Sequence, residues 1–299
     1  MSTSTHPREV PRARISTIVW LACALVLAGW LGPRLSTNDA SADGATASRR
    51  PSGRTASIEP ARNRPSPSQG LVSQPTAPPS PAPTATPGLA LPPCRYADKV
   101  GEPGPDGDWT LAVLDTTRRL PAGYEPSDLV PISLSGLRGG GSIRRVVLDD
   151  LTALAVAAKR NRIPLVVRSA YRSEARQRVV FTEWVGLAGL RAAVRGSARP
   201  GHSEHQLGTT IDFAAGSDAP WAGDFGATRT GRWLARHGPQ FGFVMSYPAG
   251  SFRVTCYQAE PWHFRWVGRE AAREVVASGL TLREWLWLVS NPMIGGDHK

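Results

Sequence analysis

The pattern of apolar and polar residues predicts that the last two thirds of the chain fold around a core. Residues 142–160 have apolar positions at helical spacing, and we expect Ser142 to cap this helix at its N-terminus. The apolar positions of the helix are Val146, Val147, Leu151, Leu154 and Ala158. The β-branched run over 163–168 predicts a buried strand directly after the helix.

Capping residues and short alternating runs mark the remaining elements. Ser173 followed by Glu174 predicts a helix start, and Gln177, one turn further on, lies on the face of Ser173. Further helices are expected over 228–237, 270–277 and 282–289, the first of them ended by Gly238. Strands are expected over 111–115, 209–214 (the central one), 242–246 and 263–267, with a turn at 120–124. Helices gathered around a mixed or antiparallel sheet place this single domain in the α+β class.

The first residues of the chain predict a membrane anchor. Residues 1–14 are polar with three arginines, and residues 15–31 form an uncharged apolar run of 17 residues. Such a run is at the short end of what spans a bilayer, and the preceding arginines place its N-terminal side in the cytoplasm. We expect an uncleaved single-pass signal anchor in the cell membrane, with everything after residue 31 extracytoplasmic. The alternative is cleavage at Ala40-Ser41-Ala42, a stretch of small residues beyond the apolar run.

Residues 32–93 predict a linker. They are rich in Pro, Ser, Ala, Thr and Arg and almost lack aromatic residues. Because such a segment cannot bury enough apolar surface to offset the entropy of ordering it, we expect it to be disordered. At ~3.1 Å per residue in polyproline geometry, it would reach roughly 190 Å when fully stretched. It would tether the domain of residues 94–299, and a short motif for a partner within it is the alternative.

The charge of the chain does not predict a nucleic-acid interface. The formal net charge is +11, and nearly all of the positive charge is arginine. The arginines are spread over the N-terminus, the linker and the domain, and they form no single stripe with interleaved aromatic residues. Only loose attraction to polyanions follows, which outside the cytoplasm would be cell-envelope polymers or anionic lipid head groups.

The cysteines predict one disulfide. Cys23 lies in the apolar run, where we interpret it as a small hydrophobic residue. Cys94 and Cys256 remain, at the first residue of the domain and shortly before residue 260. In an oxidising compartment their bond would close a loop of about 162 residues and contribute ~4–5 kcal/mol. We expect this disulfide, with two unpaired cysteines as the alternative.

Residues 200–213 and 260–263 contain the candidate chemistry. His205 and Asp212 are seven residues apart with Gly208 between them. An odd separation on one unbroken strand would place the two side chains on opposite faces, so the chain must bend near Gly208 if both face one point. Two imidazoles, one carboxylate and a spare carboxylate fit a catalytic zinc site, which needs three ligands, one open position and a base.

In this interpretation one Zn²⁺ per chain is held by His205, Asp212 and His263. Glu260, three residues before His263, would take the proton of the attacking water and return it to the leaving amine, as peptide hydrolysis requires. The competing interpretation of His263 alone is an imidazole packed beside the two neighbouring tryptophans.

Three separated blocks resemble a known family. The blocks are Ser169-Ala170-Tyr171-Arg172-Ser173 with Gln177, Ser203-Glu204-His205-Gln206-Leu207-Gly208 with Asp212, and Glu260-Pro261-Trp262-His263. In this order they closely resemble the zinc D-alanyl-D-alanine carboxypeptidases of the VanY type. The resemblance covers roughly residues 114–285 and is specific because three blocks agree.

The resemblance implies removal of the terminal D-alanine from peptidoglycan stem peptides, with the zinc ligands and the base named above. Arg172 has a fixed fork of donors that would neutralise an oxyanion or hold a carbonyl or carboxylate of the substrate. An isolated arginine would instead form a surface ion pair. By resemblance, Gln177 and Ser203 orient the substrate and Tyr171 is a wall of the site.

Several alternatives remain open from the sequence. Related zinc enzymes with the same site cut other stem-peptide bonds, so a peptidoglycan endopeptidase or an L,D-carboxypeptidase is one alternative. A non-catalytic wall-binding module would predict lost ligands, and none is missing. A serine hydrolase built on Ser203 would need a Gly-x-Ser-x-Gly motif, which is absent there. Glu204 is expected to lie behind the metal ligands or at the surface and not to bind the metal, because it would point away from His205 as its neighbour on one strand. His202 adjoins the site and is expected either to support it or to be exposed.

Overall fold

The computed structural model describes residues 91–104, 107–216 and 225–291. The segments 1–14 and 15–31 and nearly all of 32–93 lie outside the described residues, so the anchor and the linker stay predictions. Within the described ranges, no helix is both long and apolar enough to cross a membrane.

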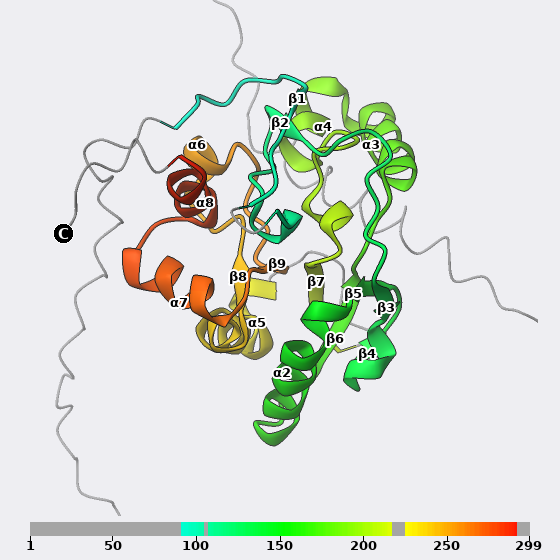
Figure 1. Cartoon of the computed structure of the whole chain (residues 1–299). Coiled ribbons are helices and arrows are strands. Elements are labelled where there is room, and N and C mark those ends of the chain that lie inside the picture. The colour runs from blue at the N-terminus through cyan, green and yellow to red at the C-terminus, as the bar shows by residue number, and fades with distance from the viewer. Residues whose placement is uncertain (1–90, 105–106, 217–224, 292–299) are drawn as a thin grey trace, which may run out of the picture. The chain divides into compact units, whose positions relative to one another are not determined.

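A five-stranded mixed sheet forms the centre of the domain (Figure 1). In spatial order its strands are β4 (Arg138–Gly139), β6 (Leu165–Ser169), β7 (Thr210–Ala215), β9 (His263–Trp266) and β8 (Phe243–Met245). β4 pairs with β6 in parallel, and the other neighbours are antiparallel. The strand predicted over 209–214 is therefore the middle strand, and the α+β class is confirmed.

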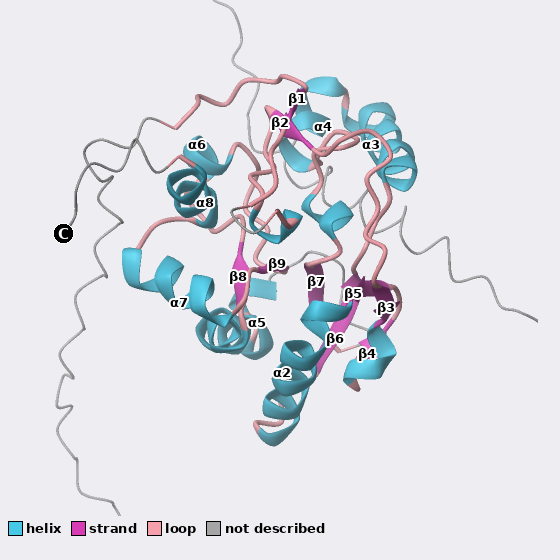
Figure 2. Ribbon diagram, in the orientation of Figure 1, coloured by secondary structure: helices cyan, strands magenta, loops and turns pink. Residues whose placement is uncertain are grey.

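Helices surround this sheet, as the cyan ribbons of Figure 2 show. They are α2 (Leu148–Arg160), α3 (Glu174–Ala188), α4 (Leu190–Gly196), α5 (Arg229–His237), α6 (Phe252–Thr255), α7 (Arg269–Ser278) and α8 (Leu282–Ser290). Local capping explains several starts: Ser173 accepts from the Arg176 N–H, and Thr281 forms a capping box with Glu284. α3 and α4 lie side by side, away from α2, α5 and α7 (Figure 1).

The main core lies between the sheet and α2. Phe213 of β7 packs edge to face against Phe243 and Phe264, with ring centroids 6.1 and 6.0 Å apart. Leu151 and Leu154 of α2 are fully buried in the same cluster. A second cluster joins α7 and α8 to β8. One face of the sheet is thus covered with apolar side chains, which leaves the other available for polar ones.

Two predicted elements are wrong. Residues 142–144 do not begin a helix but form β5 (Ser142–Arg144), which pairs antiparallel with β3 (Leu129–Pro131). Helix α2 starts only at Leu148, and Val146, predicted on its apolar face, is 49% exposed. Residues 111–115 form no strand, because residues 109–111 make a 3₁₀ turn and 112–114 continue as buried coil. Short apolar runs fit helix, strand and coil alike, and distant pairing partners decide among them.

The N-terminal part of the domain is tied to its C-terminal part. Cys94 and Cys256 form the predicted disulfide, with 5.3 Å between their Cα atoms. Arg283 of α8 donates to Asp115 at 2.6 Å, and both side chains are buried. Within the N-terminal part, β1 (Lys99–Val100) and β2 (Arg118–Arg119) pair in parallel.

Candidate active site

Three neighbouring strands place polar side chains on one face of the sheet. Asp212 of β7 is in register with His263 of β9 and with Ser169 of β6. Residues directly opposite each other on antiparallel strands have their side chains on the same face. Phe213 and Phe264, one position further on, face the core because side chains alternate along a strand.

His205 reaches this row through a tight turn. It lies on the 3₁₀ turn Glu204–Leu207, which is closed by Gly208 at φ 73°, a left-handed conformation that favours glycine. A Cβ at Gly208 would also lie 2.9 Å from Arg144 Cγ. The predicted bend is therefore present, and it brings His205 Nε2 to 3.1 Å from Asp212 Oδ2.

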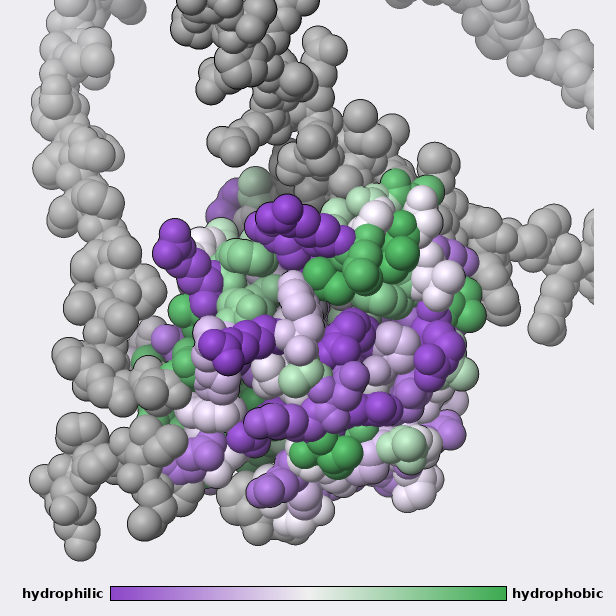
Figure 3. Space-filling view, turned by 90° about the horizontal axis from the view of Figure 1, so that it is seen from above, coloured by the Kyte–Doolittle hydropathy of each residue, from purple (hydrophilic) through white to green (hydrophobic). Residues whose placement is uncertain are grey.

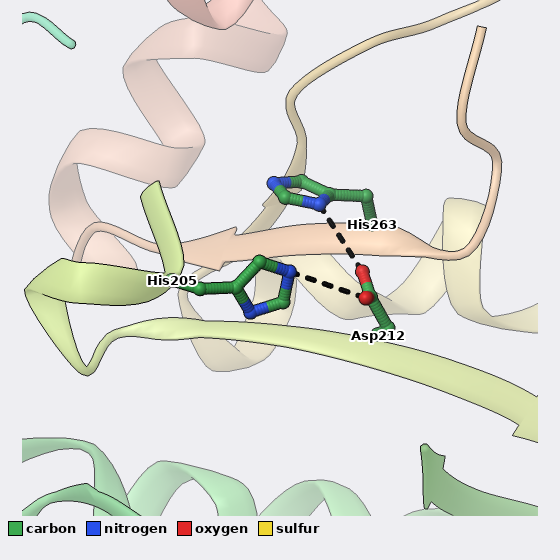
Figure 4. Close-up of side chains that lie close together, drawn as sticks. All are labelled: His205, Asp212 and His263. Atoms are coloured by element: carbon green, nitrogen blue, oxygen red, sulfur yellow. Dashed lines mark ion pairs between the residues drawn. The ribbon is translucent and has the colours of Figure 1, made fainter. Parts of the chain in front are cut away.

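The three predicted metal-binding residues converge on one point (Figure 4). Each offers a ligand atom, and these atoms lie within 4.8 Å of one another, with 3.1 Å between His263 Nδ1 and Asp212 Oδ1. Ligand atoms at ~2.0–2.1 Å from a tetrahedral ion are roughly 3.3 Å apart, so the spacing suits one zinc-sized ion. Asp212 Oδ1 is buried with His263 Nδ1 at 3.1 Å, so a cation bound between them would replace a proton that the two groups share.

The second nitrogen of each imidazole is held by a protein acceptor. His205 Nδ1–H donates to the Ala170 carbonyl at 2.8 Å, and His263 Nε2–H donates to Glu204 Oε2 at 3.0 Å. These bonds hold one ring proton of each imidazole on the far side, so the nitrogen that faces Asp212 is the one that binds a cation once it is deprotonated. Such an arrangement is typical of metal-binding histidines.

Glu204 and Arg265 form a buried ion pair behind His263. Arg265 Nη1 donates to Glu204 Oε1 at 2.9 Å, and Ser246 Oγ donates to Glu204 Oε2 at 2.6 Å. Burial opposes ionisation of Glu204, but the charge of Arg265 and the bond from His263 lower its pKa to about 2. Glu204 therefore stays charged and orients His263.

Arg265 is a residue of the site that the sequence motifs did not reveal, and Glu204 lies behind the ligand His263 as expected but for another reason. Residues 204–207 form a 3₁₀ turn and not a strand, so the side chain of Glu204 does not alternate with that of His205. Arg265 lies two positions after His263 on β9 and is fully buried. The period of two along a strand would have placed both residues on the same face.

Glu260 lies beside the converging ligand atoms. Its Oε2 is 3.4 Å from His263 Nδ1, and its backbone N–H donates to the Tyr247 carbonyl at 2.9 Å. Burial raises the pKa of Glu260 to about 7, with His263 opposing and Asp212 adding to the shift. A carboxyl group whose pKa lies near neutrality can accept a proton and return it.

The cluster attracts positive charge. Burial alone would lower the pKa of His263, but its hydrogen bonds with Asp212 and Glu204 raise that pKa to about 10. Burial works against the charge of Asp212 as well, yet His205 and His263 hold its pKa far below the usual range. The carboxylates thus hold a proton on His263 that a divalent cation would replace.

Arg172 lies at the edge of the same cluster. Its guanidinium donates to Gln177 Oε1 at 2.8 Å and to Ser169 Oγ at 2.9 Å, and Nη2 is 3.9 Å from Asp212 Oδ2. Gln177 in turn donates to the Ala198 carbonyl at 2.6 Å. Gln177 therefore positions Arg172 and the loop that leads to His205.

A cavity opens above these side chains. Its lining contains Arg172, Gln177, Ser203, Glu204, His205, Asp212, Glu260 and His263, together with Val180, Glu183, Trp184, Leu187, Gly196, Ser197, Ala198, Tyr247, Tyr257 and Trp262. Of the predicted substrate contacts, Gln177 and Ser203 line this cavity and Tyr171 does not. The cavity brings the ligand trio, the base and the arginine to one surface.

Tyr171, which was predicted to be a wall of the site, is not among the residues that line this cavity. Its backbone N–H donates to the Ser142 carbonyl at 2.9 Å, and its ring lies towards Glu125. Burial and the charge of Glu125 raise the pKa of Tyr171 to about 12. Tyr171 lies two residues after the end of β6, and the sequence pattern does not show on which side the chain leaves the strand.

His202 is neither exposed nor part of the cavity lining. It is buried, and its Nδ1 and Nε2 lie 2.8 Å from the Asp115 carbonyl and 2.9 Å from Asp98 Oδ1. His202 therefore stabilises the N-terminal segment of the domain.

Comparisons with known sequences agree with this geometry. Residues 141–269 match the VanY family, described as D-alanyl-D-alanine carboxypeptidase. The chain is 37% identical over 180 residues to YodJ of Bacillus subtilis (strain 168), covering 58% of this chain and 66% of that protein. It is 31% identical over 198 residues to a D-alanyl-D-alanine carboxypeptidase of Enterococcus faecalis (strain ATCC 700802 / V583). This match covers 62% of this chain and 68% of that protein. The chain thus spans about two thirds of each curated relative.

Solved structures show the same fold. The LdcB LD-carboxypeptidase is 35% identical, with a TM-score of 0.54 over 58% of this chain and 84% of that chain. The vancomycin resistance D,D-pentapeptidase VanY, solved as an E175A mutant with Zn(II), is 30% identical. Its TM-score is 0.51 over 60% of this chain and 99% of that chain. Fold, site and comparisons together define a peptidase. The chain belongs to the VanY family of D-alanyl-D-alanine carboxypeptidases.

Proposed function

We propose that this chain is a zinc-dependent D-alanyl-D-alanine carboxypeptidase that removes the terminal D-alanine from peptidoglycan stem peptides. The observation that supports this most is the convergence of His205, Asp212 and His263 with Glu260 Oε2 3.4 Å from a ligand nitrogen. A structural relative solved with Zn(II) points to the same metal.

The donor set favours zinc over a hard cation. Two imidazole nitrogens and one carboxylate suit zinc, whereas magnesium and calcium prefer oxygen ligands. His205, Asp212 and His263 would hold the ion, and Glu204 and the Ala170 carbonyl would keep both rings oriented. Bound there, zinc would polarise the scissile carbonyl and lower the pKa of water.

Glu260 and Arg172 would perform the protein's part of the hydrolysis. Glu260 takes one proton from the attacking water as the C–O bond forms, and it gives that proton to the amine as the C–N bond breaks. Arg172 offers its guanidinium to the charge that develops on the carbonyl oxygen or to the terminal carboxylate of the peptide. Gln177 and Ser169 hold the guanidinium in place at 2.8 and 2.9 Å.

An L,D-carboxypeptidase is the second candidate. The likeness to the LdcB LD-carboxypeptidase is at least as strong as the likeness to VanY, with TM-scores of 0.54 and 0.51. The two candidates use the same ligands and base and differ in the residue that precedes the released D-alanine. A non-catalytic wall-binding module is disfavoured because the trio, Glu260 and Arg172 all line one cavity.

Metal analysis and product analysis test the proposal together. We expect about one zinc per purified chain, and D-alanine release from a stem pentapeptide faster than from a tetrapeptide. Faster release from the tetrapeptide would support the L,D-specific candidate, and cleavage only of cross-linked muropeptides would support an endopeptidase. Glu260→Ala should keep the zinc and lose hydrolysis, and undiminished activity would remove Glu260 from the mechanism.

We further propose that the domain works outside the cytoplasm, tethered by residues 15–31 through the segment 32–93. The Cys94–Cys256 disulfide supports this location because such bonds persist in oxidising compartments. Protease added to intact spheroplasts should degrade the domain and leave cytoplasmic markers whole. Protection of the domain until the membrane is lysed would contradict this location.

A further inference from the structure

Exposed cations gather where the end of α2 meets the start of α5. Arg229, at the start of α5, donates to the Asn161 carbonyl just after α2 at 2.9 Å. Arg232 and Arg236 lie three and seven residues after Arg229, so the three arginines follow one side of α5 over ~10 Å. The end of α2 adds three more cations. The six exposed residues of this cationic stripe are Lys159, Arg160, Arg162, Arg229, Arg232 and Arg236. They belong to two segments of the sequence that only the fold brings together.

The charge of the cationic stripe is not balanced by nearby acids. Among the described residues, no carboxylate forms an ion pair with any of the six. The acids of α2, Asp149 and Asp150, lie in its first turn, ~14 Å or more along the helix axis from Lys159. Arg229 and Arg232 lie in the first turn of α5, where a cation opposes the helix dipole and like charges repel. These charges weaken α5, and an anionic partner would reverse that effect.

The cationic stripe lies on the opposite side of the sheet from the candidate active site. Leu234 of α5 and Leu151 of α2 belong to the core cluster that contains Phe213, so both helices cover this face of the sheet. Asp212 and His263 occupy the other face. In Figure 1, α2 and α5 lie at the lower end of the domain, and α3 and α4 lie at the upper end. That upper end is seen from above in Figure 3, where hydrophobic and hydrophilic residues are mixed. A partner bound along α5 and the end of α2 would therefore leave the cavity open.

The residues of α2 and α5 favour a linear polyanion as the partner. Guanidinium groups match phosphate with paired hydrogen bonds. Val156 is the only exposed large apolar residue of the two helices, whereas a helix that docks on a membrane inserts several such side chains. Trp233 is their only tryptophan, tyrosine or phenylalanine, and it is half-buried, so bases of a single-stranded nucleic acid have no aromatic surface on which to stack.

We propose that the cationic stripe binds a linear polymer of phosphodiester repeats in the cell envelope. The guanidinium groups pair with successive phosphates, and the cavity on the other face of the sheet stays free for stem peptides. This partner goes beyond the proposed reaction and depends only on the proposed location of the domain outside the cytoplasm. Held in this way, the domain would remain within the wall at the reach of its tether.

Binding of poly(glycerol phosphate) tests the cationic stripe. The full-length protein is reconstituted in phosphatidylcholine nanodiscs, and its Kd for synthetic poly(glycerol phosphate) is measured at several salt concentrations. We expect the Kd to rise roughly a hundredfold from about 50 to about 200 mM salt, because several phosphates are contacted. Arg232→Gln combined with Arg236→Gln should raise the Kd about tenfold and leave D-alanine release unchanged. The control is Arg191→Gln combined with Arg253→Gln, which removes the same charge from exposed positions on α4 and α6 and should keep the Kd.

The opposite results would overturn this partner. An equal rise in Kd for both double variants would show that net charge acts and not the cationic stripe, and absence of saturable binding at low salt would exclude the polymer. Tighter binding, through the same arginines, to single-stranded DNA or to vesicles of phosphatidylglycerol and phosphatidylcholine would assign the surface to another partner. Lys159→Gln combined with Arg160→Gln repeats the test without a change in α5 and should also raise the Kd. Because Kd is measured without catalysis, a failure of the proposed reaction would not affect this result.

Discussion

The two walls of the cavity are built in different ways. On the wall formed by β7, β9 and the turn 204–207, nearly every polar side chain contacts two others and is buried. On the wall formed by α3, one residue is buried and the apolar side chains are partly exposed. A reacting centre requires fixed geometry, whereas a surface that selects a substrate needs only shape and charge. We infer that the first wall determines the chemistry and the second the choice of peptide.

Removing a metal ligand from the first wall should have the largest effect on metal binding and hydrolysis. Asp212→Ala deletes the carboxylate that both His205 and His263 contact at 3.1 Å. We expect bound zinc and hydrolysis to fall below detection, because two imidazoles alone hold the ion weakly. Metal content by mass spectrometry and D-alanine release measure the change. His237→Ala, at the end of α5 and outside the cavity, is the control, and a zinc-loaded Asp212→Ala would contradict the assignment.

Deleting the cation behind the site should cost stability as well as activity. Arg265→Ala leaves the buried charge of Glu204 without its partner at 2.9 Å. Breaking a buried ion pair in this way costs ~3–5 kcal/mol of the free energy of unfolding. Arg269→Ala, which removes an exposed pair with Asp150, should cost about 0–1 kcal/mol. Urea unfolding measures the free energy of unfolding of both variants. Equal losses would show that the Glu204–Arg265 pair contributes no more to stability than a surface pair.

The acidity of Glu260 predicts the pH dependence of the first wall. The base must be deprotonated, and burial raises the pKa of Glu260 to about 7. The rate should therefore fall as the pH drops below that pKa, by about tenfold per unit. A bound cation lowers the pKa of this carboxyl group, so the acid limb lies at or below pH 7. kcat/KM measured from pH 4 to 8 at constant zinc tests this, and a flat profile would exclude a carboxyl base.

A truncation on the second wall should have the smallest effect on stability. Leu187 is 56% exposed, so Leu187→Ala should change the free energy of unfolding by only about 0.5 kcal/mol. If Leu187 covers the substrate, KM should rise several-fold while kcat is retained. Leu190→Ala, on α4 and 59% exposed, is the matched control outside the cavity lining. Identical kinetics for both variants would remove α3 from substrate recognition.

Local signals predicted much of the fold correctly. Ser173 and Thr228 accept from backbone N–H groups at helix starts, as expected of capping residues. The β-branched run near residue 210 became the central strand, and the bend at Gly208 is present. The helix expected from Ser142 does not form there, because residues 142–144 pair with β3 instead. The sequence pattern did not reveal this pairing.

The sequence by itself determined which residues could bind a metal and where the chain must bend, because imidazole chemistry, glycine conformation and strand alternation are local properties. Only the tertiary structure decided that Glu204 and Arg265 lie behind His263, and that Glu183 lines the cavity whereas Tyr171 does not. These contacts join segments up to 61 residues apart, from Glu204 to Arg265. They follow from strand register and helix packing, which depend on the whole chain.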